Sequence, residues 1–445
     1  MRKLAVWMLM ALMLALPAGA EETERVQGYP DLTVNGLCVV HEEDRACVVD
    51  TWGNVVVPWG EYDWLCYWND GEYVYLRNAQ GRSGVVDARG REVIPFVWDD
   101  VGGFSEGLLA VCADGLWGYV NSRGRTVLPC RWEEVRAFCD GAAMVKQDGR
   151  WHMIDMFGEQ LMDESWDEVA WEDQDGLMVV AQGGRQGLVS MRGHTVLPCE
   201  YQWISEFSEG FAAVRREGRR YSFVNRRGEL LTPFEWESAS DFHDGCAVVG
   251  KDGHYGCINV MGNVVSPCQW DLMEDFSEGL AMVDRDGMRG YIDVTGTLVI
   301  PCEWEWAMSF HEGLAVVGRG ERYGVIDRTG ALVCDLKWDF ICDYSDGLAM
   351  VEKDGKYGYI NMRGELAIPC EWEFARPFCG GTAAVCRSMD DWNGGIGFIN
   401  VQGEIIVPDR FHWDYDNDSA YREGCFIGSV DGELFIYDRQ GNRIY

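Results

Sequence analysis

Pairs of glutamates separated by one residue recur along the sequence, among them Glu303 with Glu305 and Glu371 with Glu373. Two carboxylates that face one cleft act as the acid and as the nucleophile or base in most glycoside hydrolases. These pairs, however, fall at the same point of several sequence repeats, at the end of an expected strand. A catalytic centre occurs once, whereas a repeated pair is typical of a solvated face. The alternative is a glycan-active enzyme that uses carboxylates in a groove between repeats.

Other chemically active residue types show no spacing that is typical of a site. The seven histidines are scattered, and we find no nucleophile elbow, zinc-binding HExxH helix or phosphate-binding loop. Asp414, Asp416 and Asp418 alternate as at the start of a calcium loop, but the glycine and the closing glutamate of such a loop are missing. The sequence therefore predicts no catalytic residue, no metal site and no cofactor.

A short polar residue followed three positions later by glycine recurs twelve times, as in Asp293/Gly296, Asp327/Gly330 and Asn361/Gly364. Most of these glycines are 34 or 35 residues apart. The pattern fits a type I turn that closes a hairpin, with glycine free to adopt a positive φ. A fixed period of this length predicts a tandem repeat protein.

Each repeat reads as a short antiparallel meander. In the repeat from Gly347 to Gly380, Asp354-Gly355 marks a second hairpin turn. The apolar runs predict three strands at 348–352, 357–362 and 365–370, with a fourth extended piece at 372–378. Glycine interrupts every apolar run, so helices are disfavoured. The sequence predicts an all-β fold of about twelve repeats of about 34 residues, each with three or four strands.

An aromatic residue follows the third strand in nine consecutive repeats: Trp98, Trp132, Trp166, Tyr201, Trp236, Trp270, Trp304, Trp338 and Trp372. An exposed row of this size would be a large apolar surface, so we predict that these rings form the core. Two positions further on, the residue varies and includes both acids and aromatics, which favours a partly exposed position that we call the slot. Trp203 and Trp306 occupy the slot and are our candidate ligand-binding residues. A tolerant rim position without a ligand is the alternative.

The sequence contains 17 cysteines, and an exported chain would permit disulfides. Five of them follow the proline of the third strand, where other repeats carry Phe96 and Phe234; they are Cys130, Cys199, Cys268, Cys302 and Cys370. A position shared by cysteine and phenylalanine favours a buried apolar thiol. Disulfides between repeats and a ladder of metal-binding thiolates are the alternatives, although no CxxC pair or paired histidines support them.

Trp117-Gly118, Tyr255-Gly256, Tyr323-Gly324 and Tyr357-Gly358 each precede an apolar run and the polar turn. In this the chain resembles the WG repeats, also called KWG repeats, over nearly its whole length. The resemblance implies a bacterial β-repeat protein, often exported, with no catalytic residues to transfer. Several repeats depart from the pair, among them Trp151-His152, Tyr221-Ser222 and Arg289-Gly290. The glycine itself implies close approach of a neighbouring backbone or ring.

One repeat is too small to bury a core of its own, so neighbouring repeats must pack together. A closed, propeller-like arrangement and an open superhelical stack both satisfy this requirement. We favour propeller-like packing, because a short meander resembles a blade and closure protects the sheet edges. We expect repeats over residues 21–387, an insertion at 388–395, and divergent repeats or a cap at 396–445.

The first 20 residues read as a signal peptide. Arg2 and Lys3 precede an apolar run at 4–16, and Ala18-Gly19-Ala20 matches a cleavage site after Ala20. The apolar run is shorter than the roughly 20 residues that span a bilayer. We therefore expect a secreted or cell-envelope protein whose mature chain does not insert into the membrane.

The net charge of −35 disfavours binding to nucleic acid or to anionic lipid. Because almost every feature of the chain is repeated, the sequence favours a non-enzymatic scaffold that binds a protein or a glycan at the cell envelope. A purely structural spacer and the glycan-active enzyme are the alternatives.

Overall fold

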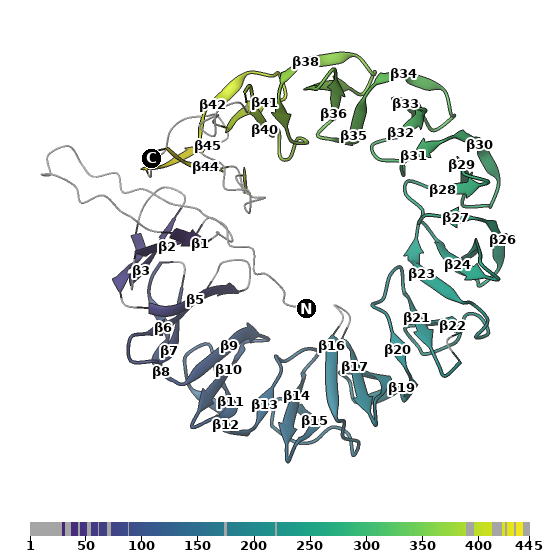
Figure 1. Cartoon of the computed structure of the whole chain (residues 1–445). Coiled ribbons are helices and arrows are strands. Elements are labelled where there is room, and N and C mark those ends of the chain that lie inside the picture. Colours follow the sequence, from purple (N-terminus) through teal and green to yellow (C-terminus); the bar gives the residue numbers. More distant parts are fainter. Residues whose placement is uncertain are drawn as a thin grey trace, which may run out of the picture. The chain divides into compact units, whose positions relative to one another are not determined.

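The computed structural model describes residues 29–31, 37–42, 45–50, 55–60, 62–68, 73–87, 89–172, 176–218, 220–388, 396–411, 421–422, 425–430 and 433–438. All regular elements in these ranges are β-strands (Figure 1), which confirms the predicted all-β class. The predicted signal peptide, most of the 388–395 insertion and the acids at 414–418 lie outside the described residues. No helix in the described ranges is long and apolar enough to cross a membrane.

The described strands form twelve antiparallel sheets, nine with four strands and three with three. Within each sheet the strands follow chain order, as in the meander of β35 (Phe340–Ser345), β36 (Leu348–Lys353), β37 (Lys356–Asn361) and β38 (Leu366–Trp372). The three predicted strands of this repeat are therefore confirmed. The extended piece predicted at 372–378 instead begins the next sheet as β39 (Phe374–Ala375), because it pairs with the strand that follows it.

The chain divides into two compact units, the first made of residues 1–169, 191–194 and 410–445 and the second of 170–190 and 195–409. The strands that lie wholly or largely in the first unit are β1 (Tyr29–Asp31), β2 (Leu37–Glu42), β3 (Arg45–Asp50), β4 (Val55–Gly60), β5 (Tyr62–Trp68), β6 (Tyr73–Asn78), β7 (Ser83–Asp87), β8 (Glu92–Trp98), β9 (Asp100–Ser105), β10 (Leu108–Ala113), β11 (Leu116–Asn121), β12 (Thr126–Trp132), β13 (Glu134–Val135), β14 (Ala142–Gln147), β15 (Arg150–Asp155), β43 (Tyr421–Arg422), β44 (Cys425–Val430) and β45 (Glu433–Asp438).

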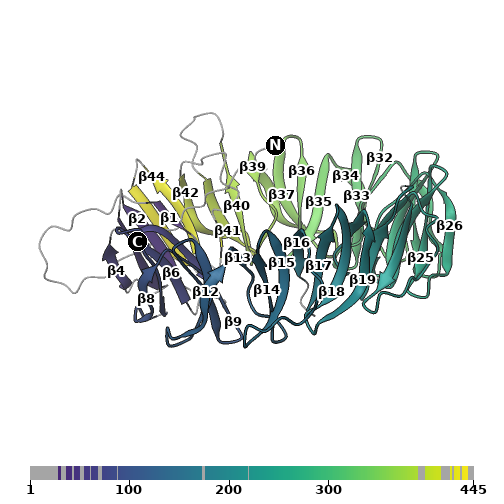
Figure 2. The ribbon, with the colours of Figure 1, turned by 90° about the horizontal axis from the view of Figure 1, so that it is seen from below.

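In the second unit the sheets stand side by side, with their first strands on one side of the row and their last strands on the other (Figures 1 and 2). Besides β35–β39, its strands are β16 (Glu168–Glu172), β17 (Leu177–Gln182), β18 (Arg185–Ser190), β19 (His194–Tyr201), β20 (Trp203–Ile204), β21 (Phe211–Arg215), β22 (Tyr221–Asn225), β23 (Ser238–His243), β24 (Cys246–Lys251), β25 (His254–Asn259), β26 (Val264–Trp270), β27 (Leu272–Met273), β28 (Leu280–Arg285), β29 (Met288–Asp293), β30 (Leu298–Trp304), β31 (Trp306–Ala307), β32 (Leu314–Arg319), β33 (Arg322–Asp327), β34 (Leu332–Trp338), β40 (Thr382–Cys386), β41 (Ile396–Asn400) and β42 (Ile405–Phe411).

The glycine of the aromatic–glycine pair lies beneath the backbone of the fourth strand. In the sheet β23–β26, Tyr255 pairs with Trp270 and Cys257 with Ser266, so three residues of β26 pass opposite Gly256. A methyl group on Gly256 would lie 2.4 Å from the carbonyl oxygen of Ser266. The bulge also accommodates Pro267, which has no N–H to contribute to a ladder. The close backbone approach inferred from the sequence is confirmed.

In two of the three three-stranded sheets, a larger residue replaces this glycine. His152 lies on β15 and Ser222 on β22, and each sheet has three strands. Two isolated bridges in each sheet remain of the ladder, which are Trp151 with Trp166 and Ile154 with Gln160 in one sheet, and Tyr221 with Trp236 and Val224 with Leu230 in the other. Cys47, at the same position of the first sheet, is an exception because β4 is retained there. The fourth strand therefore usually depends on the absence of a side chain at one position.

The core lies between neighbouring sheets. One cluster joins Tyr359, Ile368 and Trp372 of one sheet to Val385 and Ile399 of the next. Eight of the nine core aromatics are at most 4% exposed, and Trp98 is half-buried. Core packing of these rings is confirmed, as is the expectation that one repeat completes the core of another.

The cysteines whose side chains are described are all free thiols. Cys302 and Cys370 pack against the cores of neighbouring sheets, and burial raises the pKa of both thiols. The two thiols pack against apolar cores as predicted, but all five cysteines at this position are half-buried rather than fully buried.

Acidic residues at the hairpin tips link successive repeats. Each lies in the turn between the first and second strands, and its carboxylate accepts a hydrogen bond from the backbone N–H of a glycine in the next repeat. The pairs are Glu106 with Gly141, Glu209 with Gly245, Asp244 with Gly279, Glu278 with Gly313, Glu312 with Gly347, and Asp346 with Gly381. These carboxylates therefore serve both as surface charge and as contacts between repeats.

Candidate binding site

The slot residues lie at the start of the first strand of each sheet. Trp203 on β20 is 37% exposed and Trp306 on β31 is 43% exposed, and Leu272 and Phe340 are similarly open to solvent. In the first unit the slot holds Asp100, Glu134 and Glu168. The predicted partial exposure is confirmed, and the apolar members of the row belong to the second unit.

Trp203 packs against the ring of Tyr221 in the same sheet, edge to face, with 6.1 Å between ring centroids. On the neighbouring strand it pairs with Arg215. It does not line either of the two cavities described below. Its exposed surface therefore lies outside both cavities.

Trp306 lies beneath a cation. The guanidinium carbon of Arg289 is 4.4 Å from the centroid of the Trp306 ring. Arg289 also donates a hydrogen bond of 3.1 Å to the carbonyl oxygen of Ala307, and it lies 3.7 Å from the carboxylate of Asp284. Arg289 stands where most repeats have the aromatic residue of the WG pair. This substitution therefore places an arginine in contact with the candidate residue Trp306.

Trp306 also lines a cavity of about 360 Å³, which we call the aromatic pocket. Tyr323 and Phe340 line it as well, with their rings edge to face and 6.5 Å between centroids. The remaining lining residues are Met308, Ile341, Cys342, Asp343, Tyr344, Ser345 and Pro377. Apart from Asp343, no lining residue is an acid or a base, so the cavity is mainly apolar with a single carboxylate.

The carboxylate of Asp343 is half-buried, and burial raises its pKa, while the nearby His311 acts in the opposite direction. No lysine or arginine of the described chain forms an ion pair with Asp343. Burial also raises the pKa of the adjacent Cys342 thiol to about 11. The pocket therefore has a neutral thiol and an acid whose charged neighbour is His311 rather than a lysine or an arginine.

A second cavity of about 570 Å³ lies two repeats earlier, and we call it the polar groove. Tyr255 and Asp275 lie where the aromatic pocket has Tyr323 and Asp343. Ser238, Ser240 and Ser309, however, stand in the places of Trp306, Met308 and Pro377. The two cavities thus occupy equivalent positions in the fold, but one is lined by hydroxyl groups where the other is lined by apolar side chains.

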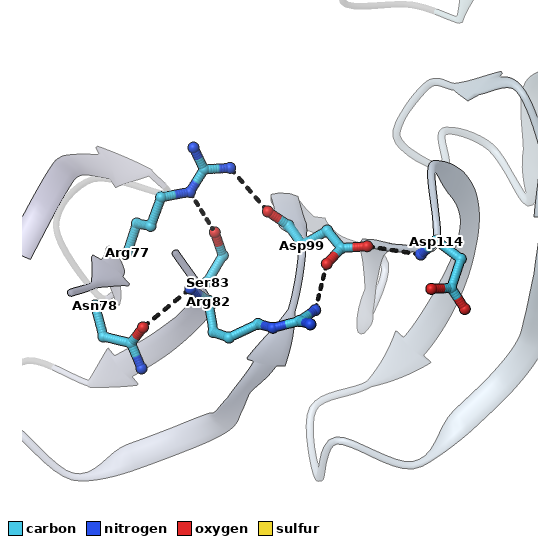
Figure 3. A network of polar contacts seen from close by, with 6 residues as sticks. All are labelled: Arg77, Asn78, Arg82, Ser83, Asp99 and Asp114. Carbon is cyan, nitrogen blue, oxygen red and sulfur yellow. Dashed lines mark hydrogen bonds and ion pairs between the residues drawn. The ribbon is translucent and has the colours of Figure 1, made fainter. Parts of the chain in front are cut away.

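The paired glutamates have structural contacts. Glu305 accepts a hydrogen bond of 2.7 Å from the backbone N–H of Gly320, and Glu303 lies 4.0 Å from Arg319. Figure 3 shows the matching acid of the first unit, Asp99, which accepts a hydrogen bond of 2.6 Å from the N–H of Asp114 and pairs with Arg82. The acid after the core aromatic therefore caps the next hairpin turn.

The sequence singled out Trp306 as a candidate ligand-binding residue but did not single out Tyr323, Phe340 or Asp343. Phe340 shares the slot, so its position was visible in the alignment of the repeats. Asp343 carried no signal, because Asp241 and Asp275 occupy the same position in other repeats. No group of three or more His, Cys, Asp or Glu side chains in the described ranges could hold a metal ion.

A model of the WG-containing repeat matches the sequence in eight tandem segments that cover more than half of the chain. The segments are 84–117, 117–151, 187–219, 221–254, 255–288, 290–322, 323–357 and 357–387. The chain belongs to the WG-repeat family. In WG-repeat terms, the aromatic pocket lies between three of the matched segments, and Tyr323-Gly324 opens one of them.

Several solved structures share local similarity with this WG-repeat chain. The computationally designed protein Ika8 is 17% identical over 68% of this chain and 93% of its own, with a TM-score of 0.24. BamB from Moraxella catarrhalis is 13% identical over 58% and 90%, with a TM-score of 0.28. The extracellular domain of the hybrid two component system BT3049 from B. thetaiotaomicron is 8% identical over 93% and 69%, with a TM-score of 0.25. No curated protein matches the chain.

Proposed function

We propose that this chain is an exported, non-enzymatic repeat scaffold that binds a protein or a glycan at the cell envelope. The contact surface is the row of slot residues in the second unit, with the aromatic pocket at its centre. One observation carries the proposal: Trp306 and Phe340, each about 40% exposed, meet at one cavity, whereas the core aromatics of the same repeats are buried. Exposed rings at a concave site are typical of binding surfaces.

The exported location rests on the basic and apolar segment at residues 1–20. The non-enzymatic role rests on the paired glutamates, since Glu303 and Glu305 contact Arg319 and Gly320. A glycoside hydrolase would instead direct two carboxylates into one cleft.

Co-sedimentation of the purified mature chain with envelope fractions and with insoluble polysaccharides, over a salt series, tests this function. We expect saturable pelleting that survives salt, with no soluble fragments released. Released fragments would favour the glycan-active enzyme, and no pelleting with any fraction would favour a structural spacer.

A further inference from the structure

The aromatic pocket takes residues from three consecutive repeats. Trp306 comes from one first strand, Phe340 and Asp343 from the next, and Pro377 from the loop of the third. Tyr323 on β33 also lines the pocket and belongs to the same sheet as Trp306. Such a cavity forms where the fold brings neighbouring repeats together.

The residues that line the aromatic pocket favour binding of a positively charged ligand. Aromatic faces carry negative charge density and attract cations within about 6 Å, most strongly when water is excluded. Asp343 adds a formal negative charge to the same cavity, and no lysine or arginine of the described ranges neutralises it. Half-burial of a charged carboxylate is costly. His311 offsets part of that cost, and a bound cation would remove more of it.

The preceding repeat already places a cation at the equivalent position. There Arg289 holds its guanidinium 4.4 Å from the slot ring of Trp306. One repeat later, Tyr323 replaces Arg289 and Phe340 replaces Trp306. The arginine is thus absent from the later repeat, where a cavity is open.

The apolar lining narrows the type of cation. A metal ion or a primary ammonium would lose hydration that Met308, Ile341 and Pro377 cannot replace. A quaternary ammonium has no N–H to satisfy and presents methyl groups to the rings. We propose that the aromatic pocket binds a trimethylammonium group against Trp306, Tyr323 and Phe340, with Asp343 as its counter-ion. This inference rests on the proposed binding function and names the chemistry of its ligand.

Ligand-observed NMR on the full mature chain measures this binding, with choline as the probe. The matched control ligand is 3,3-dimethylbutan-1-ol, which has the same shape but carbon in place of the charged nitrogen. We expect choline to bind about tenfold more tightly than the neutral analogue. Equal dissociation constants, or no choline binding, would overturn the proposal.

Variants locate the site. Phe340→Leu and Asp343→Asn should each weaken choline binding about tenfold, because one removes a ring and the other the charge. Asp275→Asn changes the equivalent acid of the polar groove, where Ser238 replaces the slot tryptophan, and should leave choline binding unchanged. Equal losses in all three variants would contradict a specific pocket, and circular dichroism would confirm that each variant folds.

A peptide that contains trimethyllysine is the second probe in the binding experiment. Tighter binding of the peptide than of choline would point to a modified protein as the source of the group, and the reverse to a small molecule or a glycan substituent. Envelope pelleting without choline binding would overturn this inference and leave the scaffold function standing. Choline binding without any pelleting would contradict the scaffold function and leave the trimethylammonium site standing.

Discussion

The backbone N–H of Gly313 donates a hydrogen bond of 2.8 Å to the carboxylate of Glu278, 35 residues earlier in the chain. Loss of this acceptor removes a contact between repeats, so Glu278→Ala should lower the free energy of unfolding by about 1 kcal/mol. Urea denaturation measures the change. Glu321→Ala is the matched control, because Glu321 is exposed and makes no such contact, and an equal loss in both variants would contradict the linking role.

The glycine of the WG pair should tolerate no side chain where the fourth strand crosses it. Gly256→Ala would place a methyl group 2.4 Å from the carbonyl oxygen of Ser266. We expect destabilisation of about 3 kcal/mol, or detachment of β26, because the backbone must shift. Denaturation midpoints and amide hydrogen exchange of residues 264–270 would report the two effects.

Ser222→Ala is the comparison for that variant, because Ser222 occupies the same position in a sheet that has no fourth strand. It loses the hydrogen bond of 2.5 Å to the carbonyl oxygen of Thr232 and the contact of 3.3 Å with the Thr232 hydroxyl. We expect a loss of about 1 kcal/mol. If Gly256→Ala cost no more than this, the backbone crossing would not explain the glycine.

Asp343→Asn should raise stability at neutral pH. Burial raises the pKa of Asp343 above its usual 3.8, so ionisation costs free energy in the folded state and stability falls as pH rises through that range. The variant avoids this cost and should melt at a higher temperature at pH 7, with no difference well below pH 3.8. Thermal unfolding over a pH series measures the effect, and a lower melting temperature at pH 7 would contradict it.

Asp327→Asn should change the pH dependence of stability in the opposite direction. The Thr329 hydroxyl and the turn N–H groups donate to the Asp327 carboxylate and lower its pKa. Its stabilising contribution is therefore present above the usual pKa and is lost as pH falls through the lowered one. The wild-type chain should exceed this variant in stability at neutral pH and lose that advantage in acid.

The thiols should differ strongly in reactivity. Cys379 is exposed, whereas Cys257 is buried and its pKa is raised by a neighbouring thiol and by burial. Because the thiolate is the reactive form, brief alkylation of the native chain should label Cys379 well before Cys257. Mass spectrometry measures the labelled fractions, and similar labelling rates for both thiols would contradict the protection of Cys257 by burial.

The repeat, its turns and its core were predictable because each is specified within one repeat. Gly296, Gly330 and Gly364 mark hairpin turns by local chemistry, and Trp304 and Trp338 mark the core by their period. The bulge over Gly256 was predictable in kind, since glycine within a strand signals close approach.

The contacts between repeats were not predictable. Glu278 looks like any surface acid until the fold brings Gly313 beside it. The aromatic pocket combines Trp306 and Tyr323 of one sheet with Asp343 of the next. The residues at these positions differ from repeat to repeat, so the sequence does not reveal the combination.

Co-sedimentation of paired variants tests the binding face most directly. Trp203→Ser with Trp306→Ser removes the exposed slot rings, whereas Leu298→Ser with Leu332→Ser removes comparably exposed apolar residues from the fourth strands. We predict that the first pair abolishes saturable binding to envelope material and that the second pair retains wild-type affinity. Equal retention, or equal loss, in the two pairs would contradict a binding face at the slot.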